Sequence, residues 1–246
     1  MDVIGVIPAR YQSTRLSHKL LRPLCGKPLI QWTWESASKA NSLDDILIAC
    51  DDIKIKEVAE GFGAKCILTS TSHTSGTDRI AEAINSIDAK VIINIQADEP
   101  MVHPSIVNEL VATMLKNPTL VMATVKKEIT DTNEIDDPNV VKVVCSKDGF
   151  ALYFSRFAVP YIREAPSKYK YHKHLGIYAY NKDFLFAFKN LPESGLEKAE
   201  KLEQLRVLEA GYKIRVIETQ FDSIGVDVER DLYQIESILK ERDAKL

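Results

Sequence analysis

Short apolar runs that alternate with helix-like segments dominate the first half of the sequence. The first run, Val3–Ile7, is nearly unbroken, as expected of a strand buried on both faces of a parallel sheet. Further strands are expected at 45–50, 65–69, 90–95 and 120–125, and helices at 28–40, 53–62, 77–87 and 104–116. This alternation with short connections predicts an α/β fold, Rossmann-like and doubly wound, with a mainly parallel sheet.

The pattern changes after about residue 136. Strands are expected at 140–144, 150–155 and 175–180 with few helices between them, which predicts an inserted, partly antiparallel section over about 137–195. A helix at 199–209, a strand at 213–218 and a final helix from 228 are expected to return the chain to the sheet. Because the sequence contains no low-complexity linker and no repeat, residues 1–246 are expected to form a single domain.

Composition argues against several classes of protein. Hydrophobic residues make up 45% and charged residues 27% of the chain, as in ordinary globular proteins. The net charge of −3 lacks the basic excess of a general nucleic-acid binder. No basic segment followed by a long apolar stretch opens the sequence, so we expect neither a signal peptide nor a membrane span.

The four cysteines are expected to be free thiols, mostly buried. They are Cys25, Cys50, Cys66 and Cys145. None of them shows the C-x-x-C spacing of a metal or redox motif, and three lie in or beside apolar strand-like runs. This pattern is typical of a protein in the reducing cytoplasm.

The carboxyl ends of the predicted strands are the expected place for a ligand. In open parallel sheets ligands bind outside these strand ends. The polar loops that follow Ile7, Cys50, Thr69 and Ile95 should therefore converge on one crevice.

The loop at 8–19 brings three cations to that crevice. Arg10 and Arg15 offer fork-shaped donors to phosphate oxygens, and Lys19 offers a mobile point charge. This set suits a triphosphate, and the alternative is a solvated basic loop. Neither G-x-x-x-x-G-K-[ST] nor G-x-G-x-x-G occurs in the sequence, which weakens the P-loop and dinucleotide alternatives.

Two acids are candidates for a metal site. Asp98 follows a central strand, and a carboxylate at such a strand end suits Mg²⁺, although the segment also fits a simple turn. Asp227 either joins it or caps the last helix. The segment Ser75-Gly-Thr77 likewise either contacts a base edge or caps a helix.

Seven segments then occur in one order: Ile7-Pro-Ala-Arg10 with Ser13 and Arg15-Leu16, Ser75-Gly-Thr77, Gln96-Ala-Asp98-Glu-Pro100, Tyr153-Phe-Ser-Arg156, His174-Leu-Gly-Ile-Tyr178, Leu202-Glu-Gln-Leu-Arg206 and Gly225-Val-Asp227. This series closely resembles the 3-deoxy-manno-octulosonate cytidylyltransferase family. The resemblance runs from Val3 to about Leu232.

The resemblance implies an enzyme that transfers CMP from CTP to the anomeric hydroxyl of 3-deoxy-D-manno-octulosonate (Kdo) and releases pyrophosphate, for lipopolysaccharide biosynthesis. It implies a cytoplasmic homodimer, with sugar binding and dimerisation in the section over 137–195 and with no nucleic-acid or membrane partner. Asp98 and Asp227 would hold Mg²⁺, while Lys19 and Arg15 would stabilise the departing pyrophosphate.

The same resemblance implies two sets of ligand contacts. The nucleotide would be contacted by Ala9, Arg10, Ser13, Arg15, Lys19, Ser75, Gly76 and Arg79. The sugar acid would be contacted by Gln96, Arg156, Arg163, His174, Tyr178, Glu203 and Gln204. From the residues alone, Tyr178 also fits a core aromatic on a strand, and Glu203 and Gln204 also fit exposed helix positions.

Two positions depart from the family pattern. The phosphate loop commonly reads Arg-Leu-Pro-Gly-Lys, whereas His18 stands here in place of glycine. A residue with a Cβ resists positive φ, although His18 would supply another donor. Ala97 replaces the glycine of Gln-Gly-Asp, a change expected to perturb the site only modestly.

These departures leave two alternatives open. The first is the same chemistry on an amino-substituted octulosonate or a nonulosonate. The second is a non-catalytic nucleotide-sugar sensor, an interpretation that His18 and Ala97 would favour. The presence of both Asp98 and Asp227 argues against a sensor, which has no need of a complete metal pair.

Overall fold

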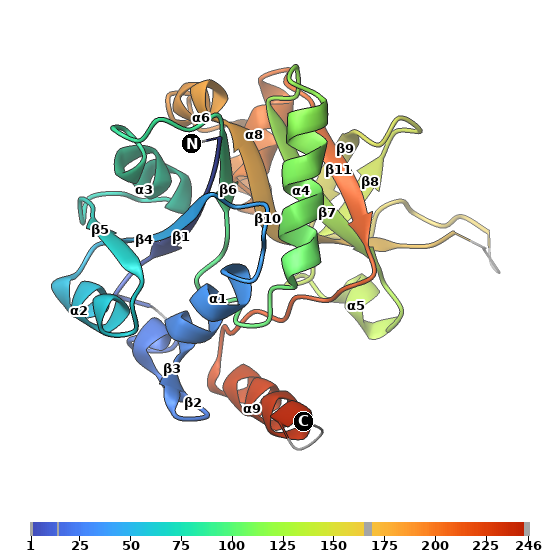
Figure 1. Ribbon diagram of the computed structural model, residues 1–246. Helices are drawn as coiled ribbons and strands as arrows, with labels where there is room; N and C mark the ends of the chain where they lie inside the picture. Colours follow the sequence, from blue (N-terminus) through green and yellow to red (C-terminus); the bar gives the residue numbers. More distant parts are fainter. Residues whose placement is uncertain (1, 14, 165–168, 244–246) are drawn as a thin grey trace. The chain divides into compact units, whose positions relative to one another are not determined.

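The computed structural model describes residues 2–13, 15–164 and 169–243, with side chains described as far as residue 241. The helices and strands are labelled in Figure 1, and the chain divides into two compact units. The first comprises residues 1–108 and 223–246, and the second comprises residues 109–222. The section predicted over 137–195 lies within the second unit.

Four parallel strands form the sheet of the first unit, in the order β6, β1, β4, β5. Their bounds are β1 (Val3–Ala9), β4 (Asp45–Cys50), β5 (Lys65–Leu68) and β6 (Val91–Asn94). The apolar run of β1 is buried along nearly its whole length. Since Ala9 pairs with Cys50, β1 and β4 end at the same edge, which is where the sequence places its polar loops.

Helices follow these strands as the sequence predicts. They are α1 (Leu29–Ala37), α2 (Ile53–Gly61) and α3 (Gly76–Ala83). A short helix η1 (Lys19–Leu21) and a small hairpin of β2 (Pro23–Leu24) and β3 (Lys27–Pro28) come before α1. The last helix, α9 (Glu229–Asp243), lies beside this hairpin in Figure 1, and the Cys25 thiol contacts the backbone oxygen of Glu236.

Helix α4 (Pro104–Lys116) carries the chain into the second unit, which is mixed in strand direction. Its strands are β7 (Met122–Glu128), β8 (Lys142–Cys145), β9 (Ala151–Ser155), β10 (His172–Asn181) and β11 (Ile214–Thr219). β11 runs parallel to β7, whereas β10 is antiparallel to β7 and β8, and β8 to β9. A mixed α/β fold with antiparallel strands in this section is therefore confirmed.

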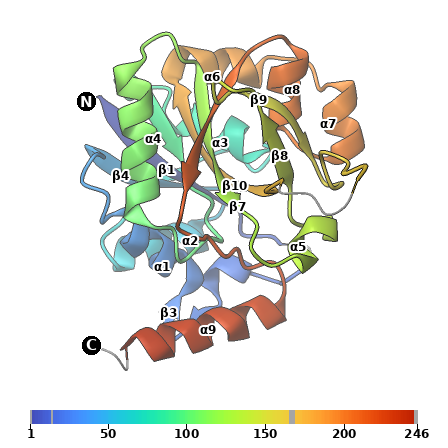
Figure 2. The same cartoon turned by 90° about the vertical axis from the view of Figure 1, so that its right-hand side faces the viewer.

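The prediction of one continuous helix over 199–209 is wrong. The structure has two short helices instead, α7 (Gly195–Glu200) and α8 (Gln204–Glu209), which Figure 2 shows near β9. Lys201 takes a left-handed conformation with φ of 54°, which ends α7 and leaves backbone carbonyls without a helical partner. The helices α5 (Asn133–Asp136) and α6 (Lys182–Lys189) were not predicted.

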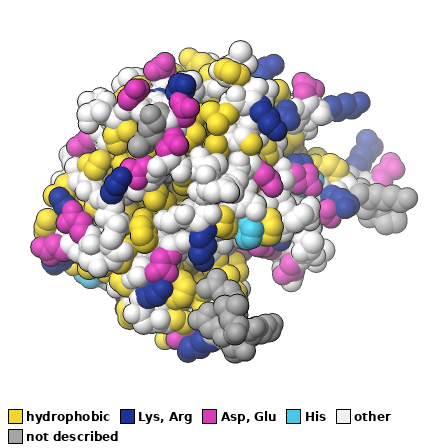
Figure 3. Space-filling model, viewed as in Figure 1, with side chains coloured by type: hydrophobic (Ala, Val, Ile, Leu, Met, Phe, Trp, Pro, Cys, Tyr) yellow, Lys and Arg dark blue, Asp and Glu magenta, His cyan; other side chains and the backbone are white. Residues whose placement is uncertain are grey.

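Two further features concern the length of the helices and the charges on the surface. No helix in the described part of the chain is long and apolar enough to cross a bilayer. Positive and negative side chains are interspersed on the face shown in Figure 3.

Candidate functional site

Two polar loops of the first unit enclose a cavity at the carboxyl end of its sheet. One follows β1, and the other follows β6. The cavity has a volume of about 250 Å³. It is lined by Pro8, Arg10, Gln12, Ser13, Arg15, Lys19, Leu20, Gln96, Ala97, Asp98 and Asp227. The predicted convergence of loops is thus confirmed for these segments.

Lys19 lines this cavity and joins distant parts of the chain. Its Nζ donates to Asp98 Oδ2 at 2.6 Å and to the carbonyl oxygen of Val226 at 2.7 Å, and it lies 3.5 Å from Asp227 Oδ1. Only 11% of the Lys19 side chain is exposed. Two carboxylates therefore face one buried cation, which offsets their mutual repulsion.

Arg15 completes the cluster from the other side. Its Nη2 donates to Asp227 Oδ1 at 2.8 Å. The Asp227 carboxylate is thus directed to cations, while the amides of Asp227 and Val228 are accepted by Asp231 Oδ2. Asp231, in the first turn of α9, thereby holds the backbone of the segment that carries Asp227.

The donor set at Lys19 fits a hard divalent cation. Mg²⁺ prefers oxygen ligands and is commonly held by one or two carboxylates together with phosphate oxygens. Asp98 and Asp227 supply two carboxylates around a position that a cation already occupies. No group of three His, Cys, Asp or Glu side chains among the described residues is arranged to hold a metal, so the remaining ligands would come from substrate and water.

His18 answers the question raised by the missing glycine. It adopts the left-handed conformation, with φ of 52°, so the loop keeps the conformation that glycine favours. Its ring stacks on Tyr11 with centroids 4.2 Å apart, and its Nδ1 is buried without a hydrogen-bond partner among the residues that the structure describes. Stacking holds a backbone that is otherwise strained by about 1–2 kcal/mol for a residue with a Cβ.

The segment around Ser75 lies against the end of β1. The Ser75 hydroxyl accepts the amide of Asp78, so it caps α3. A Cβ at Gly76 would stand 3.3 Å from Pro8 Cγ, closer than most such contacts. Glycine therefore permits the close approach of these two segments. Whether Ser75 and Gly76 also contact a nucleotide stays a prediction.

Two residues expected to contact the nucleotide are buried. Ala9 and Arg79 are 0% exposed, so a nucleotide contact by either stays a prediction. Ala9 is the last residue of β1 and pairs with Cys50 of β4. Arg79 instead donates to Asp51 Oδ2 at 3.1 Å and to Thr69 Oγ1 at 2.6 Å, which joins the loops after β4 and β5.

Asp51 is a residue of this region that the sequence analysis missed. Its Oδ1 accepts the amide of Tyr11 at 2.8 Å, and its Oδ2 accepts Arg79. It thereby fixes the loop that carries Arg10 and Arg15. The available signal was its position directly after β4, at the edge where the other polar loops end.

Gln96 and Ala97 anchor the loop that follows β6 and carries Asp98. The Ala97 side chain is buried, and its carbonyl accepts the Thr33 hydroxyl at 2.9 Å. Gln96 lines the cavity and donates to Asn94 Oδ1 at 3.4 Å. The Asp98 carbonyl accepts the amide of Val226 at 2.9 Å, which aligns the segment that carries Asp227.

In the second unit, Arg156 is held by backbone oxygens. Its guanidinium donates to the carbonyls of Glu200 at 2.7 Å, Pro138 at 2.8 Å and Lys201 at 3.5 Å. Two of these carbonyls lie where Lys201 ends α7, so the helix break supplies the acceptors. The positive end of Arg156 suits this helix terminus. The Arg156 side chain also lines a cavity of about 420 Å³ in the second unit.

His174 and Tyr178 lie together on β10. His174 Nε2 lies 2.9 Å from the Thr124 hydroxyl, and its ring contacts those of Phe154 and Tyr178. Burial lowers the pKa of His174 to about 3, so its ring is neutral at physiological pH. It can therefore act as a hydrogen-bonding group and not as a cation.

The other expected sugar contacts differ in exposure. Gln204 is only 4% exposed at the start of α8, so the alternative of an exposed helix position is wrong for it. Glu203 is partly exposed at the preceding position, and Arg163 is exposed. Tyr178 is partly exposed and stacks on Tyr180. Gln96 belongs to the first unit, and the remaining six belong to the second.

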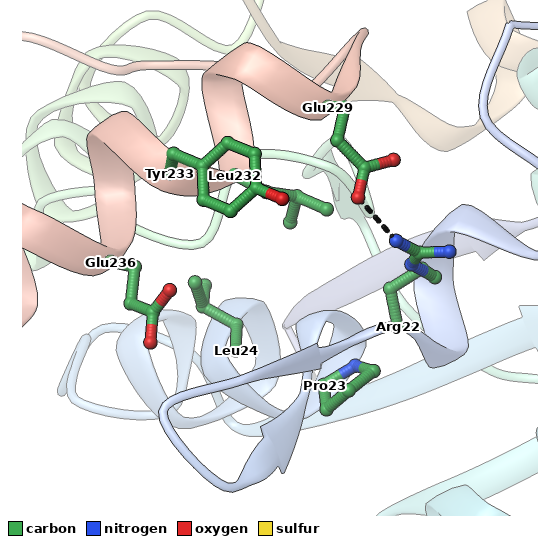
Figure 4. Close-up of a pocket in the computed structure, with 7 residues that line it drawn as sticks. All are labelled: Arg22, Pro23, Leu24, Glu229, Leu232, Tyr233 and Glu236. Atoms are coloured by element: carbon green, nitrogen blue, oxygen red, sulfur yellow. Dashed lines mark hydrogen bonds and ion pairs between the residues drawn. The ribbon is translucent and has the colours of Figure 1, made fainter.

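A second cavity of the first unit, of about 390 Å³, lies between α9 and the hairpin (Figure 4). Leu24, Leu232 and Tyr233 line it, and Arg22 Nη2 pairs with Glu229 at 2.5 Å. Glu236 also lines it, so it holds one cation and two acids and lacks the three cations that line the cavity at Lys19 together with Asp98 and Asp227.

Comparison with known proteins decides between the possible families. A model of the cytidylyltransferase family matches residues 4–214. A 3-deoxy-manno-octulosonate cytidylyltransferase of Solibacter usitatus is 44% identical over 97% of this chain and 94% of its own length. The chain belongs to the 3-deoxy-manno-octulosonate cytidylyltransferase family. The enzyme of the same name from Fusobacterium nucleatum is also 44% identical and is covered in full, as is this chain.

A solved structure of this family agrees with the fold. It is described as CMP:2-keto-3-deoxy-manno-octonic acid synthetase complexed with CTP, with a TM-score of 0.93, 40% identity, and coverage of 98% of this chain and 100% of its own. A cytidylyltransferase from Leptospira borgpetersenii, at 15% identity and a TM-score of 0.66 over 98% of this chain and 87% of its own, shares the fold.

Proposed function

We propose that this protein transfers CMP from CTP to the anomeric hydroxyl of 3-deoxy-D-manno-octulosonate and releases pyrophosphate. The observation that carries the proposal is the cluster in which Asp98, Asp227, Lys19 and Arg15 converge at the end of the sheet. Members of its family with the same name match over nearly the whole chain.

The cations of the cluster would serve the triphosphate. Arg15 presents a forked donor that suits phosphate oxygens, and Lys19 presents an ammonium group. On binding of CTP, both would exchange carboxylate oxygens for phosphate oxygens. They would then stabilise the negative charge that develops on the departing pyrophosphate. Arg10 and Ser13 line the same cavity and are proposed as further nucleotide contacts.

Asp98 and Asp227 would hold Mg²⁺ once Lys19 turns to the phosphates. When bound there, Mg²⁺ would lower the pKa of the sugar hydroxyl and offset charge at the α-phosphate. The hydroxyl oxygen would attack the α-phosphorus as the bond to the β-phosphate oxygen breaks. No covalent intermediate with the protein is required.

The residues of the second unit would recognise the sugar acid. Its carboxylate calls for a cation, which Arg156 offers, and its hydroxyls call for neutral donors and acceptors. His174, Tyr178, Glu203 and Gln204 provide such groups. Gln96 and Arg163 are proposed as additional contacts.

A pyrophosphate-release assay tests the proposal. It should use CTP with Kdo, with an amino-substituted octulosonate and with a nonulosonate, and it should include UTP, ATP and Mg²⁺-free controls. We expect release with CTP and Kdo only when Mg²⁺ is present. Preference for another sugar acid would keep the chemistry and change the substrate. Binding of CTP with no release for any sugar would favour the sensor.

We further propose a cytoplasmic homodimer, with dimerisation in the section over 137–195. Exposed apolar side chains of that section support the proposal, among them Phe157 at 76% and Tyr161 at 83% exposure. Sedimentation of the wild type and of Phe157→Asp measures it. A monomeric wild type at micromolar concentration would contradict the dimer.

A further inference from the structure

Two of the four cysteines lie side by side on neighbouring strands of the first unit. Cys50 Sγ is 3.3 Å from Cys66 Sγ. Cys50 is the last residue of β4, and Cys66 is the second residue of β5. The register pairs Ile48 with Cys66 and Cys50 with Leu68, so the two thiols share one face of the sheet.

The thiols differ in access to solvent. Cys50 is 0% exposed, whereas Cys66 is partly exposed on β5, the last strand in the order of this sheet. A small oxidant can therefore reach the pair from the side of Cys66. The hydrogen bond between the thiols lowers the pKa of Cys50 and raises that of Cys66, so Cys50 is the thiol of the pair that loses its proton more readily.

The pair is joined to the nucleotide loop through short contacts. The carbonyl of Cys50 accepts the amide of Thr69 at 2.8 Å and its hydroxyl at 2.9 Å. The next residue, Asp51, accepts the amide of Tyr11 at 2.8 Å, within the loop that carries Arg10 and Arg15. A displacement at the end of β4 is thus passed directly to that loop.

We propose that Cys50 and Cys66 form a modification site, at which a hydroperoxide converts the dithiol to a disulfide that weakens CTP binding. One thiol transfers two electrons to the peroxide and becomes a sulfenic acid, as the O–O bond breaks and an alcohol or water leaves. The second thiol attacks that sulfur, and the S–O bond breaks with release of water. Two thiols and one hydroperoxide thus yield one disulfide, one alcohol and one water.

The expected consequence follows from geometry. A disulfide requires the sulfur atoms to approach from 3.3 Å to about 2.05 Å. That movement pulls the end of β4 and, through Asp51, the Tyr11 amide. A displacement of about 1 Å in a part of an enzyme that is distant from the reacting atoms can lower its rate up to about a hundredfold. We therefore expect the disulfide to raise the KM for CTP by about tenfold.

The test uses the full chain, reduced and then treated with hydrogen peroxide. Free thiols are counted by alkylation and intact mass, peptide mapping locates any disulfide, and the KM for CTP is measured before and after dithiothreitol. We expect the wild type and Cys145→Ser to gain the Cys50–Cys66 bond and to recover on reduction. Cys66→Ser should gain no such bond and keep its KM.

Other results would overturn the proposal. One is the absence of the Cys50–Cys66 bond in the folded, peroxide-treated wild type. Another is an equal rise in KM in Cys66→Ser, and a third is formation of the bond with no change in KM. The effect on CTP rests on the proposed function, which the reduced enzyme tests separately. If the reduced enzyme shows no turnover, the proposed function fails, while the mass measurement still decides whether the bond forms.

Discussion

The candidate nucleotide residues and the candidate sugar residues hold their charges in different ways. In the first unit, Lys19 and Arg15 form ion pairs with Asp98 and Asp227. In the second unit, Arg156 is held by neutral backbone carbonyls. Under the proposed function, Asp98 and Asp227 would have to release Lys19 and Arg15 before they could hold a metal, whereas Arg156 would not have to break an ion pair to meet an anion.

This difference teaches how each region prepares for its ligand. A triphosphate and Mg²⁺ together supply a negative partner for each cation and a positive partner for the acids, so their binding should be mutually favourable. Mg²⁺ alone has to displace Lys19 without such compensation. The second unit instead resembles a preorganised site, in which surrounding contacts fix the side chains in advance.

The largest expected effect comes from removing the carboxylate of Asp98 or Asp227, the two acids that are paired with Lys19 and Arg15. Asp98→Asn and Asp227→Asn should each lower turnover by about 10²–10³-fold, because a metal that stabilises transition-state charge contributes several kcal/mol. Pyrophosphate release measures this, with circular dichroism to check the fold. The matched control is Glu229→Gln, which also removes one carboxylate of the first unit but lies in the second cavity. Near-normal turnover in either aspartate variant would refute its role.

A smaller effect is expected from a substitution at Arg156 in the second unit. Arg156→Met should lower kcat/KM for the sugar acid by about 10–100-fold, because hydrogen bonds to a charged group contribute about 1.5–3 kcal/mol. Steady-state kinetics with each substrate varied separates the two sites. The KM for CTP should stay unchanged, and an equal loss toward CTP would break the division between the regions.

His174 is expected to give the second unit a pH dependence of its own. Its folded pKa of about 3 lies below the ordinary value of 6.5, so the unfolded chain binds the proton more tightly. Stability is therefore full above about pH 6.5 and falls by up to about 1.4 kcal/mol per pH unit below it. Urea unfolding of wild type and His174→Gln between pH 7 and 5 measures this.

The variant should show a shallower slope. Burial also lowers the pKa of His172, so a residual slope of the same sign is expected. An unchanged slope in His174→Gln would show that His174 does not control this dependence.

The smallest effect concerns the strained loop of the first unit. His18→Gly should be more stable than His18→Ala by about 1 kcal/mol, because alanine retains the Cβ that opposes a positive φ. Both variants lose the stack on Tyr11, so their difference isolates the backbone term. Thermal unfolding compares them. Equal stability would mean that position 18 is free to leave the left-handed conformation.

The sequence predicted the parallel strands well because each is a short apolar run followed by a polar loop. It also placed Lys19 and Asp98 in the segments that follow β1 and β6, where the structure has them. It failed at Lys201, since a single left-handed residue inside a helix-like pattern leaves no signal in hydrophobic periodicity. The burial of Arg79 was equally hidden, because its partner Asp51 lies on another loop and only the fold brings the two together.

Coordination by two distant acids is the central claim, and a crystal structure of the complex with CTP and Mn²⁺ tests it most directly. We predict an anomalous scattering peak within about 2.1 Å of an oxygen of both Asp98 and Asp227, with Lys19 moved to the triphosphate. A peak bound by phosphates alone, with Lys19 still paired to Asp98, would contradict the account.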